Sequence, residues 1–231
     1  MSETVTIDTA DGRFSAYLAR PKTTPAPAIV VIQEIFGVNA DMRKTCDDLA
    51  AQGYLAICPD LYWRQEPNVE LFDKTDADWK KALALYTAFD VDAGMKDLAA
   101  TIKFTRGLDG NSGKVGAMGY CLGGLLAYLT ATRTDADASV AYYGVGVDKL
   151  IGEAQQIRHP LMTHIAEEDE FVPKEAQAVV REGLKGRAGV EVYSYPGMSH
   201  AFARNNGIHY DKTNADLANG RTLAFFAANL R

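Results

Sequence analysis

The chain has 231 residues, of which 47% are hydrophobic and 23% charged, and its formal net charge is −6. This acidic balance argues against nucleic-acid binding, which needs a clustered basic surface, and no apolar run approaches the ~20 residues that span a bilayer. Three scattered cysteines are too few for a disulfide framework or a zinc site, and Met1–Thr4 lacks the pattern of a signal peptide, so we expect a cytoplasmic protein with reduced thiols.

Apolar runs alternate with longer helical patterns along the chain, which is typical of a largely parallel sheet with flanking helices. The first two runs, near Val5–Ile7 and Phe14–Ala19, are joined through Asp11 and Gly12 and predict a hairpin. The next elements expected are an apolar strand buried on both faces, a helix and a second strand: Ala28–Gln33, Ala40–Gln52 and Tyr54–Cys58.

The middle of the chain begins with Pro67–Asp78, a polar and poorly periodic segment that we interpret as a loop covering the site. Asp76–Arg106 is helical in pattern, with a break expected near Asp90–Gly94. The alternation then continues through four strands, Lys114–Gly119, Ser139–Tyr143, Pro160–Ala166 and Val190–Tyr195, and three helices, Leu122–Ala131, Lys174–Lys185 and Asn214–Asn229. No linker or repeat interrupts this order, so residues 1–231 are expected to form one α/β domain.

The junction between a strand and a helix at Lys114–Gly124, KVGAMGYCLGG, carries the first chemical motif. Cys121 lies at the centre of a G-x-nucleophile-x-G elbow, with cysteine where serine usually stands. In this strained turn, side chains two positions either side of the nucleophile would collide, which explains both glycines. Cys121 also lies near the positive end of the following helix, which favours a thiolate. A small buried core residue is the commoner fate of such a cysteine, but the strand–turn–helix context favours a nucleophile.

A thiol nucleophile needs a base, and the base needs an orienting acid. In the α/β-hydrolase fold they follow in the order nucleophile, acid, histidine. Of the four histidines, only His200 lies just past a strand on a Gly-containing loop, whereas His164 lies within a strand and is interpreted as a hydrogen-bonded interior residue. The acid is sought in Glu167–Glu170, where Asp169 is preferred because Asp-x-x-Val-Pro leads into a helix opened by proline. The two glutamates before Asp169 remain alternatives.

Four strings in the right order resemble the dienelactone hydrolase (carboxymethylenebutenolidase) family: Gln33–Asn39, Gly119–Gly124, Tyr142–Gly146 and Ser199–Arg204. The likeness runs over nearly the whole chain and includes Cys58–Tyr62 and Ala88–Asp90. It implies a single-domain α/β-hydrolase with a mostly parallel central sheet and helices on both faces. It also implies an enzyme that needs no cofactor or metal and acts on a small-molecule lactone or ester, and it favours a monomer. The acidic charge and the lack of a long apolar run predict no nucleic-acid or membrane partner.

The resemblance also implies a mechanism, and supports Asp169 as the acid. Cys121 would attack the carbonyl of an unsaturated lactone, of the type that yields maleylacetate, to form an acyl-enzyme. His200, held by Asp169, would activate the water that releases the product. The backbone N–H groups of Ile35 and Leu122 would bind the oxyanion.

Glu34 matches a family carboxylate that lies close to the nucleophile and holds the thiol proton before attack. A carboxylate at the end of an apolar strand is costly to bury unless it is paired. A structural salt bridge, to Arg43 or Arg204, is therefore the alternative interpretation of Glu34, since buried ion pairs can imitate active sites.

The substrate-binding residues match the family only in part. The resemblance implies that Arg204 grips a substrate carboxylate, and it places Tyr143 at the site, although such a tyrosine is as often core packing. The family's second arginine is replaced by Trp79, which makes the pocket more apolar unless Lys80–Lys81 restores the charge without the bidentate geometry. A serine that often follows the family histidine is replaced by Ala201.

Three functions follow in order of preference. The first is hydrolysis of an anionic unsaturated lactone, and the second is hydrolysis of a neutral small ester or lactone by the same residues. The third, from another class, is a non-catalytic or redox role for the thiol of Cys121, which is weakened because no resolving cysteine stands at C-x-x-C spacing.

Overall fold

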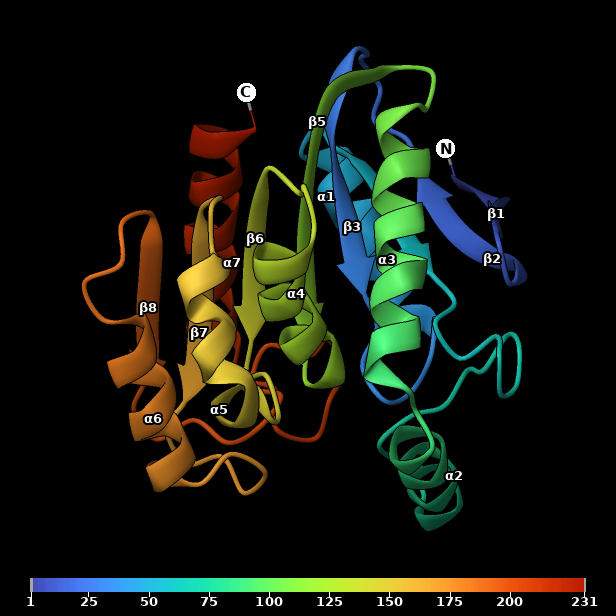
Figure 1. Cartoon of the computed structure of the whole chain (residues 1–231). Coiled ribbons are helices and arrows are strands. Elements are labelled where there is room, and N and C mark those ends of the chain that lie inside the picture. The colour runs from blue at the N-terminus through green and yellow to red at the C-terminus, as the bar shows by residue number, and fades with distance from the viewer. Residues whose placement is uncertain (1, 231) are drawn as a thin grey trace.

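The computed structural model describes residues 2–230, and within them eight strands form one sheet in the order β1-β2-β4-β3-β5-β6-β7-β8 (Figure 1). The first two strands form an antiparallel hairpin whose second strand pairs antiparallel with β4, and all other pairs are parallel. The strands are β1 (Ser2–Thr9), β2 (Gly12–Ala19), β3 (Ala26–Ile32), β4 (Leu55–Pro59), β5 (Asn111–Tyr120), β6 (Ala138–Tyr142), β7 (Leu161–Ala166) and β8 (Val190–Tyr195).

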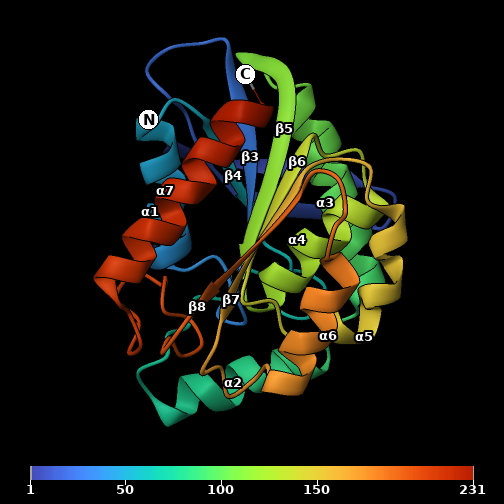
Figure 2. The same cartoon turned by 90° about the vertical axis from the view of Figure 1, so that its left-hand side faces the viewer.

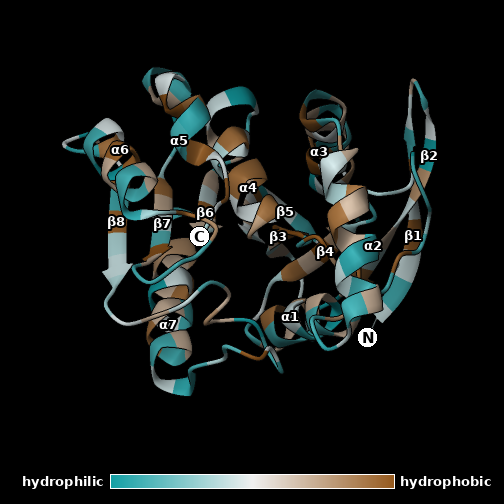
Figure 3. Ribbon diagram, turned by 90° about the horizontal axis from the view of Figure 1, so that it is seen from below, coloured by the Kyte–Doolittle hydropathy of each residue, from teal (hydrophilic) through white to brown (hydrophobic). Residues whose placement is uncertain are grey.

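Helices cover both faces of the sheet. Helices α1 and α7 lie on one face, and α3, α4, α5 and α6 lie on the other, while α2 lies below the end of the sheet (Figures 2 and 3). The helices are α1 (Ala40–Ala51), α2 (Asp76–Thr87), α3 (Val91–Arg106), α4 (Leu122–Arg133), α5 (Val147–Leu150), the 3₁₀ helix η1 (Ile151–Gln156), α6 (Lys174–Leu184) and α7 (Lys212–Asn229). No helix within residues 2–230 has the length and apolar content needed to cross a membrane.

This architecture confirms the predicted α/β-hydrolase class and most element boundaries. The break in the long helical segment is at Asp90, whose side chain accepts a hydrogen bond from the Ala93 N–H and so begins a new helix. Strand β5 begins at Asn111 rather than Lys114 because Asn111 pairs with Ala26 of β3. The short helices α5 and η1 were not predicted, since neither is long enough to show an amphipathic period.

The parallel strands bring distant parts of the sequence to one end of the sheet, where the strands terminate. All residues of β4, β6 and β7 are buried, as expected for strands covered on both faces. Because β3 to β8 run in the same direction, their carboxyl ends meet at one end of the sheet, the end that Figure 3 faces. In open α/β sheets, ligands bind outside the carboxyl ends of the strands, which is this end of the sheet.

His164 lies in the interior of β7, as predicted, and is fully buried in a hydrogen-bonded network. Its Nδ1 lies 2.7 Å from the Tyr195 hydroxyl and its Nε2 lies 3.0 Å from the Thr222 hydroxyl. Burial, with the positive charge of Arg221, lowers the pKa of His164 to about 3. The imidazole therefore stays neutral in the folded protein and belongs to the core.

Lowering the pH from 7 to 5 is expected to remove about 2 kcal/mol of unfolding free energy through His164 alone. The unfolded chain protonates this imidazole near pH 6.5, whereas the folded protein does not until about pH 3. The stabilisation is thus complete above pH 6.5 and is lost as the pH falls. Urea unfolding at both pH values tests this, with His164→Gln as the comparison. A loss of stability equal in the two proteins would contradict the assignment.

Candidate active site

Cys121 lies in a strained turn between β5 and α4. Its backbone has φ 57° and ψ −113°, in the region that L-residues avoid, and its side chain is 7% exposed at the carboxyl end of the sheet. A Cβ placed on Gly119 would lie 2.2 Å from the Gly123 carbonyl oxygen, and one on Gly123 would lie 2.4 Å from that of Ile32. The two glycines therefore allow α4 to pack against β3 while the turn presents the thiol.

Replacing Gly123 with alanine is expected to destabilise the fold by about 3 kcal/mol or more, because its Cβ would meet main-chain atoms that cannot rotate away. Gly220 is the matched control. It is exposed in α7, and a Cβ there meets nothing within 4 Å, so Gly220→Ala should leave stability unchanged or raise it by about 0.5–1 kcal/mol. Denaturant unfolding of both variants measures the difference, and similar effects would contradict the packing argument.

The structure brings His200 and Asp169 together in the same interior. Nδ1 of His200 lies 2.7 Å from Oδ2 of Asp169, and both side chains are almost fully buried. The other oxygen of Asp169 accepts hydrogen bonds from the N–H groups of Phe171 and Val172 at 2.8 and 3.1 Å. These bonds fix the carboxylate in the turn after β7, so that it faces the imidazole.

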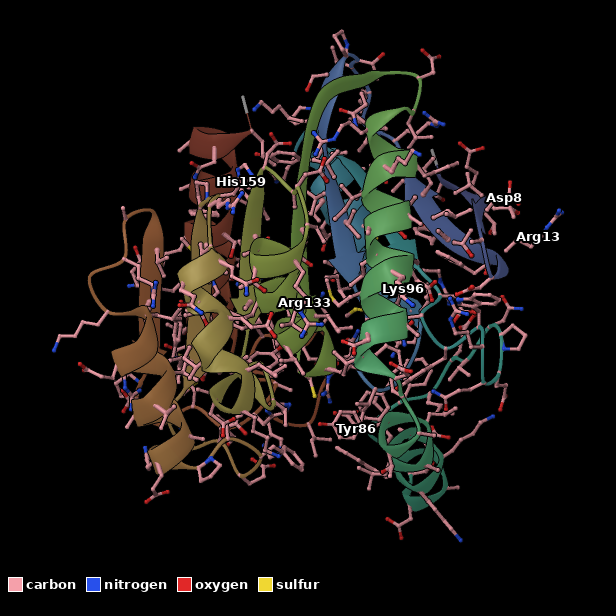
Figure 4. All side chains as sticks on the ribbon, viewed as in Figure 1. Asp8, Arg13, Tyr86, Lys96, Arg133 and His159 are labelled. Carbon is pink, nitrogen blue, oxygen red and sulfur yellow. The ribbon has the colours of Figure 1, made fainter. Side chains whose placement is uncertain are left out.

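The alternative acids and histidines lie elsewhere. Glu168 is exposed and pairs with Lys174, and Glu167 is only partly buried, so Asp169 is the acid that the fold turns inward. His209 is exposed on the following loop. His159 precedes β7 and lies at the opposite end of the sheet from Tyr86 of α2, which marks the pocket end (Figure 4).

The thiol of Cys121 is the electrostatic partner of His200. Burial alone would lower the pKa of His200, but the charge of Cys121 and the hydrogen bond with Asp169 outweigh it and raise this pKa to about 10. Nε2 of His200 is buried and has no partner with hydrogen-bond geometry within residues 2–230. The imidazole therefore has one nitrogen fixed by Asp169 and the other available for proton transfer near the thiol.

The resemblance implies that the backbone N–H groups of Ile35 and Leu122 bind the oxyanion. Ile35 follows β3 and lines the same pocket as Cys121, and Leu122 is the first residue of α4. Within the described chain, neither N–H donates to a backbone carbonyl outside the regular elements. Unpaired N–H groups at a helix start and after a neighbouring strand can accommodate a developing negative charge.

Glu34 is held by Arg204 through two hydrogen bonds. Nε and Nη2 of Arg204 donate to the two carboxylate oxygens of Glu34, at 2.5 and 3.2 Å. Of the two salt bridges considered from the sequence, the one to Arg204 is present, while Arg43 pairs with Glu70. Nη1 of Arg204 donates to a second carboxylate, Asp73, at 2.6 Å. Sequence reasoning missed Asp73, because an acid in a polar loop carries no sign of burial.

The pocket beside Cys121 has an empty volume of about 370 Å³ and a mainly apolar wall. Its lining residues are Ile35, Trp79, Leu83, Tyr86, Cys121, Val145, Phe171, His200 and Arg204. Trp79 of α2 packs edge-on against Phe36, with ring centroids 5.2 Å apart, and stacks with Phe171 at 6.4 Å. Trp79 therefore forms an apolar wall at the position where the family resemblance implies an arginine.

Arg204 lines this pocket as well, but the remaining expected substrate-binding groups do not. Lys80 is exposed, and Lys81 pairs with Glu66, so neither adds a charge to the pocket wall. Tyr143 is buried behind His200, with ring centroids 5.0 Å apart, and its hydroxyl has no partner in the described chain. Burial and the charge of Glu34 raise its pKa well above 10, so this hydroxyl keeps its proton.

The chain is similar to known proteins over almost its whole length. The model of the dienelactone hydrolase family matches residues 14–230. A protein of Azospirillum brasilense assigned as a carboxymethylenebutenolidase is 50% identical over 225 residues, which cover 95% of each chain. The carboxymethylenebutenolidase of Pseudomonas putida is 42% identical, over 98% of this chain and 97% of its own. A crystal structure from Klebsiella pneumoniae, assigned as a dienelactone hydrolase, has a TM-score of 0.86 at 28% identity, covering 98% of both chains.

Proposed function

Because the chain belongs to the dienelactone hydrolase family, and is thereby a hydrolase of esters and lactones, we propose that it works through a thioester on Cys121. The observation that carries this proposal is that Cys121 and His200 line one pocket, while the buried Asp169 holds Nδ1 of His200 at 2.7 Å. In this proposal the thiol of Cys121 gives its proton to His200, whose pKa is raised to about 10, against the effect of burial, by the charge of Cys121 and by Asp169, so that a thiolate and an imidazolium form the attacking pair.

In the first half of the reaction, the thiolate of Cys121 attacks the carbonyl carbon of the bound substrate. The negative charge moves to the carbonyl oxygen, which the N–H groups of Ile35 and Leu122 stabilise. When the carbon–oxygen bond breaks, the leaving oxygen takes the proton from Nε2 of His200. In a lactone the leaving group remains attached to the acyl chain, so that ring opening and acylation are one event.

In the second half, water releases the product. Acylation removes the negative charge of Cys121, and with it a main cause of the raised pKa of His200. The neutral imidazole then takes a proton from water, and the resulting hydroxide attacks the thioester. Departure of the thiolate restores the attacking ion pair, with Asp169 holding the imidazole throughout.

Glu34 is proposed to act with Arg204 at the edge of this site. Holding the thiol proton, the role implied by family resemblance, would require Glu34 first to lose its two bonds to Arg204. His200 is the group whose pKa responds to Cys121, so His200 is the better candidate for the proton acceptor. Tyr143 supports the imidazole from behind rather than contacting the substrate.

Dienelactone is the first substrate to test, because relatives named carboxymethylenebutenolidase are similar over nearly their full length. The apolar wall formed by Trp79 and Phe171, without a second cation in the pocket, favours a neutral small ester or lactone as the second candidate.

The test is to trap the covalent intermediate. Enzyme mixed with a dienelactone or with p-nitrophenyl acetate is quenched in acid within milliseconds and analysed by mass spectrometry after proteolysis. We expect the acyl mass on the peptide that contains Cys121, formed and lost at rates compatible with turnover. Turnover of either substrate without an adduct, and persisting in Cys121→Ala, would rule the proposal out.

A further inference from the structure

We propose that Trp79 and Phe171 form an aromatic clamp that holds a planar, conjugated group of the substrate. The pocket thereby selects unsaturated or aryl esters and lactones over saturated ones of equal size. This inference rests on the proposed function and names the substrate class of the same pocket. The clamp binds the substrate and leaves the reacting atoms to Cys121 and His200, so its effect should appear in ligand affinity.

The two rings of the clamp are nearly parallel and line the same pocket as Cys121. Trp79 belongs to α2 and Phe171 to the turn before α6, yet their planes differ by only 24° and their centroids lie 6.4 Å apart. Aromatic carbons in contact lie about 3.5–4 Å apart, so a planar group between two rings holds them about 7 Å apart. The separation of the two centroids is close to this value, and a rotation of one ring can therefore admit such a group.

Trp79 is the fixed side of the clamp. Its indole N–H donates to the carbonyl oxygen of Asp73 at 3.2 Å, and its ring meets that of Phe36 at 82°, with centroids 5.2 Å apart. Phe36 is buried in the core, and the guanidinium carbon of Arg204 lies 4.9 Å from its ring centroid. The indole is thus held in one orientation before a substrate enters, which lowers the entropic cost of binding.

Phe171 is the movable side of the clamp. This residue is 44% exposed, so its ring can rotate without disturbing the core, while its N–H stays bonded to Oδ1 of Asp169 at 2.8 Å. The ring meets the imidazole of His200 at 76°, with centroids 4.9 Å apart. A group held between Phe171 and Trp79 therefore lies beside His200, in the pocket that Cys121 also lines.

Stacking and the hydrophobic effect make opposite predictions for this pocket. A saturated six-membered ring has more apolar surface to remove from water than a benzene ring, so burial alone favours the saturated ligand. Stacking favours the benzene ring, because its flat face can contact an aromatic face and its quadrupole adds to the attraction. A preference for the planar ligand therefore identifies the clamp.

The experiment compares two uncharged amides of similar size, planar benzamide and saturated cyclohexanecarboxamide. Binding is measured by calorimetry in a Cys121→Ala background, where the thiol chemistry is absent. Benzamide should bind at least about 5-fold more tightly than cyclohexanecarboxamide. In Trp79→Leu and in Phe171→Leu, which keep an apolar wall, benzamide should lose about 5-fold in affinity, while cyclohexanecarboxamide changes less than about twofold.

Trp63→Leu is the matched control. Trp63 also stacks nearly parallel to a phenylalanine, Phe14, with centroids 5.7 Å apart, and its indole N–H donates to Asp97 at 2.8 Å. Trp63 lies outside the pocket lining, so its replacement should change neither affinity. Thermal unfolding of all variants shows whether the fold is retained. Phe171→Leu keeps the test intact even if Trp79→Leu does not fold, because Phe171 lies partly in solvent.

Binding of cyclohexanecarboxamide as tightly as benzamide, or equal losses of both ligands in Phe171→Leu, would overturn the inference. Because these affinities are measured without the thiol, a failure of the thioester mechanism leaves them unchanged. Conversely, absence of the planar preference leaves the acyl-enzyme on Cys121 unaffected. Failure of the mechanism and failure of the clamp are therefore separately visible.

Discussion

Replacing Cys121 with alanine is expected to lower kcat/KM for ester or lactone hydrolysis by about 10⁴-fold or more. In the proposed mechanism the substitution removes the nucleophile and also the charge that raises the pKa of His200, so that both halves of the proposed pair are lost. The N–H groups of Ile35 and Leu122 and the pocket wall remain. They can support only the weak catalysis that binding and oxyanion stabilisation give without a nucleophile.

Cys46→Ala and Cys58→Ala are the controls, because both thiols are fully buried and neither lines the pocket. Steady-state kinetics should show nearly normal kcat/KM in these folded variants. Alkylation by iodoacetamide should inactivate the wild type and both controls at Cys121. Activity close to wild type in Cys121→Ala would exclude the thioester mechanism and leave the thiol with another role.

The sequence predicted the parts of the site that depend on local pattern. Cys121 was recognisable because its glycine spacing and its place between strand and helix are consequences of one tight turn. His200 and Asp169 were recognisable because they follow strands whose carboxyl ends must meet in a parallel sheet. The interior position of His164 also followed from its place within an apolar strand, and the structure confirms it.

The parts that depend on contacts between distant loops could not be predicted. Asp73 approaches Arg204 across 131 positions of the chain, and no period or motif records that contact. The choice between proton holder and salt bridge for Glu34 likewise depends on where the side chain of Arg204 turns. Tyr143, which the resemblance placed at the site, follows the end of β6 with its backbone at φ 36°, and its ring meets that of His200 edge-on, a contact that no local pattern predicts.

Replacing His200 with asparagine is expected to lower kcat/KM by about 10³–10⁴-fold, because in the proposed mechanism one imidazole serves both half-reactions. Without it the thiol has no charged partner, the leaving oxygen has no proton donor and water has no base. The variant should still be alkylated at Cys121, more slowly than wild type. Retained hydrolysis with retained thiol chemistry would mean that another group acts as the base.

The pH dependence separates the two functions of His200. In the free enzyme its pKa is raised to about 10, so the imidazolium persists up to that pH, and kcat/KM should fall on the alkaline side only above about pH 10. In the acyl-enzyme the charge of Cys121 is gone, so Asp169 alone opposes the lowering of the pKa of His200 by burial. The pKa of His200 must therefore be lower in the acyl-enzyme than in the free enzyme. Deacylation requires the neutral imidazole, so its rate should rise with pH through that lower pKa.

Stopped-flow measurement of the acylation burst and of the following steady state should give two different pH profiles of the rate. A single shared profile would show that Cys121 does not control the proton of His200.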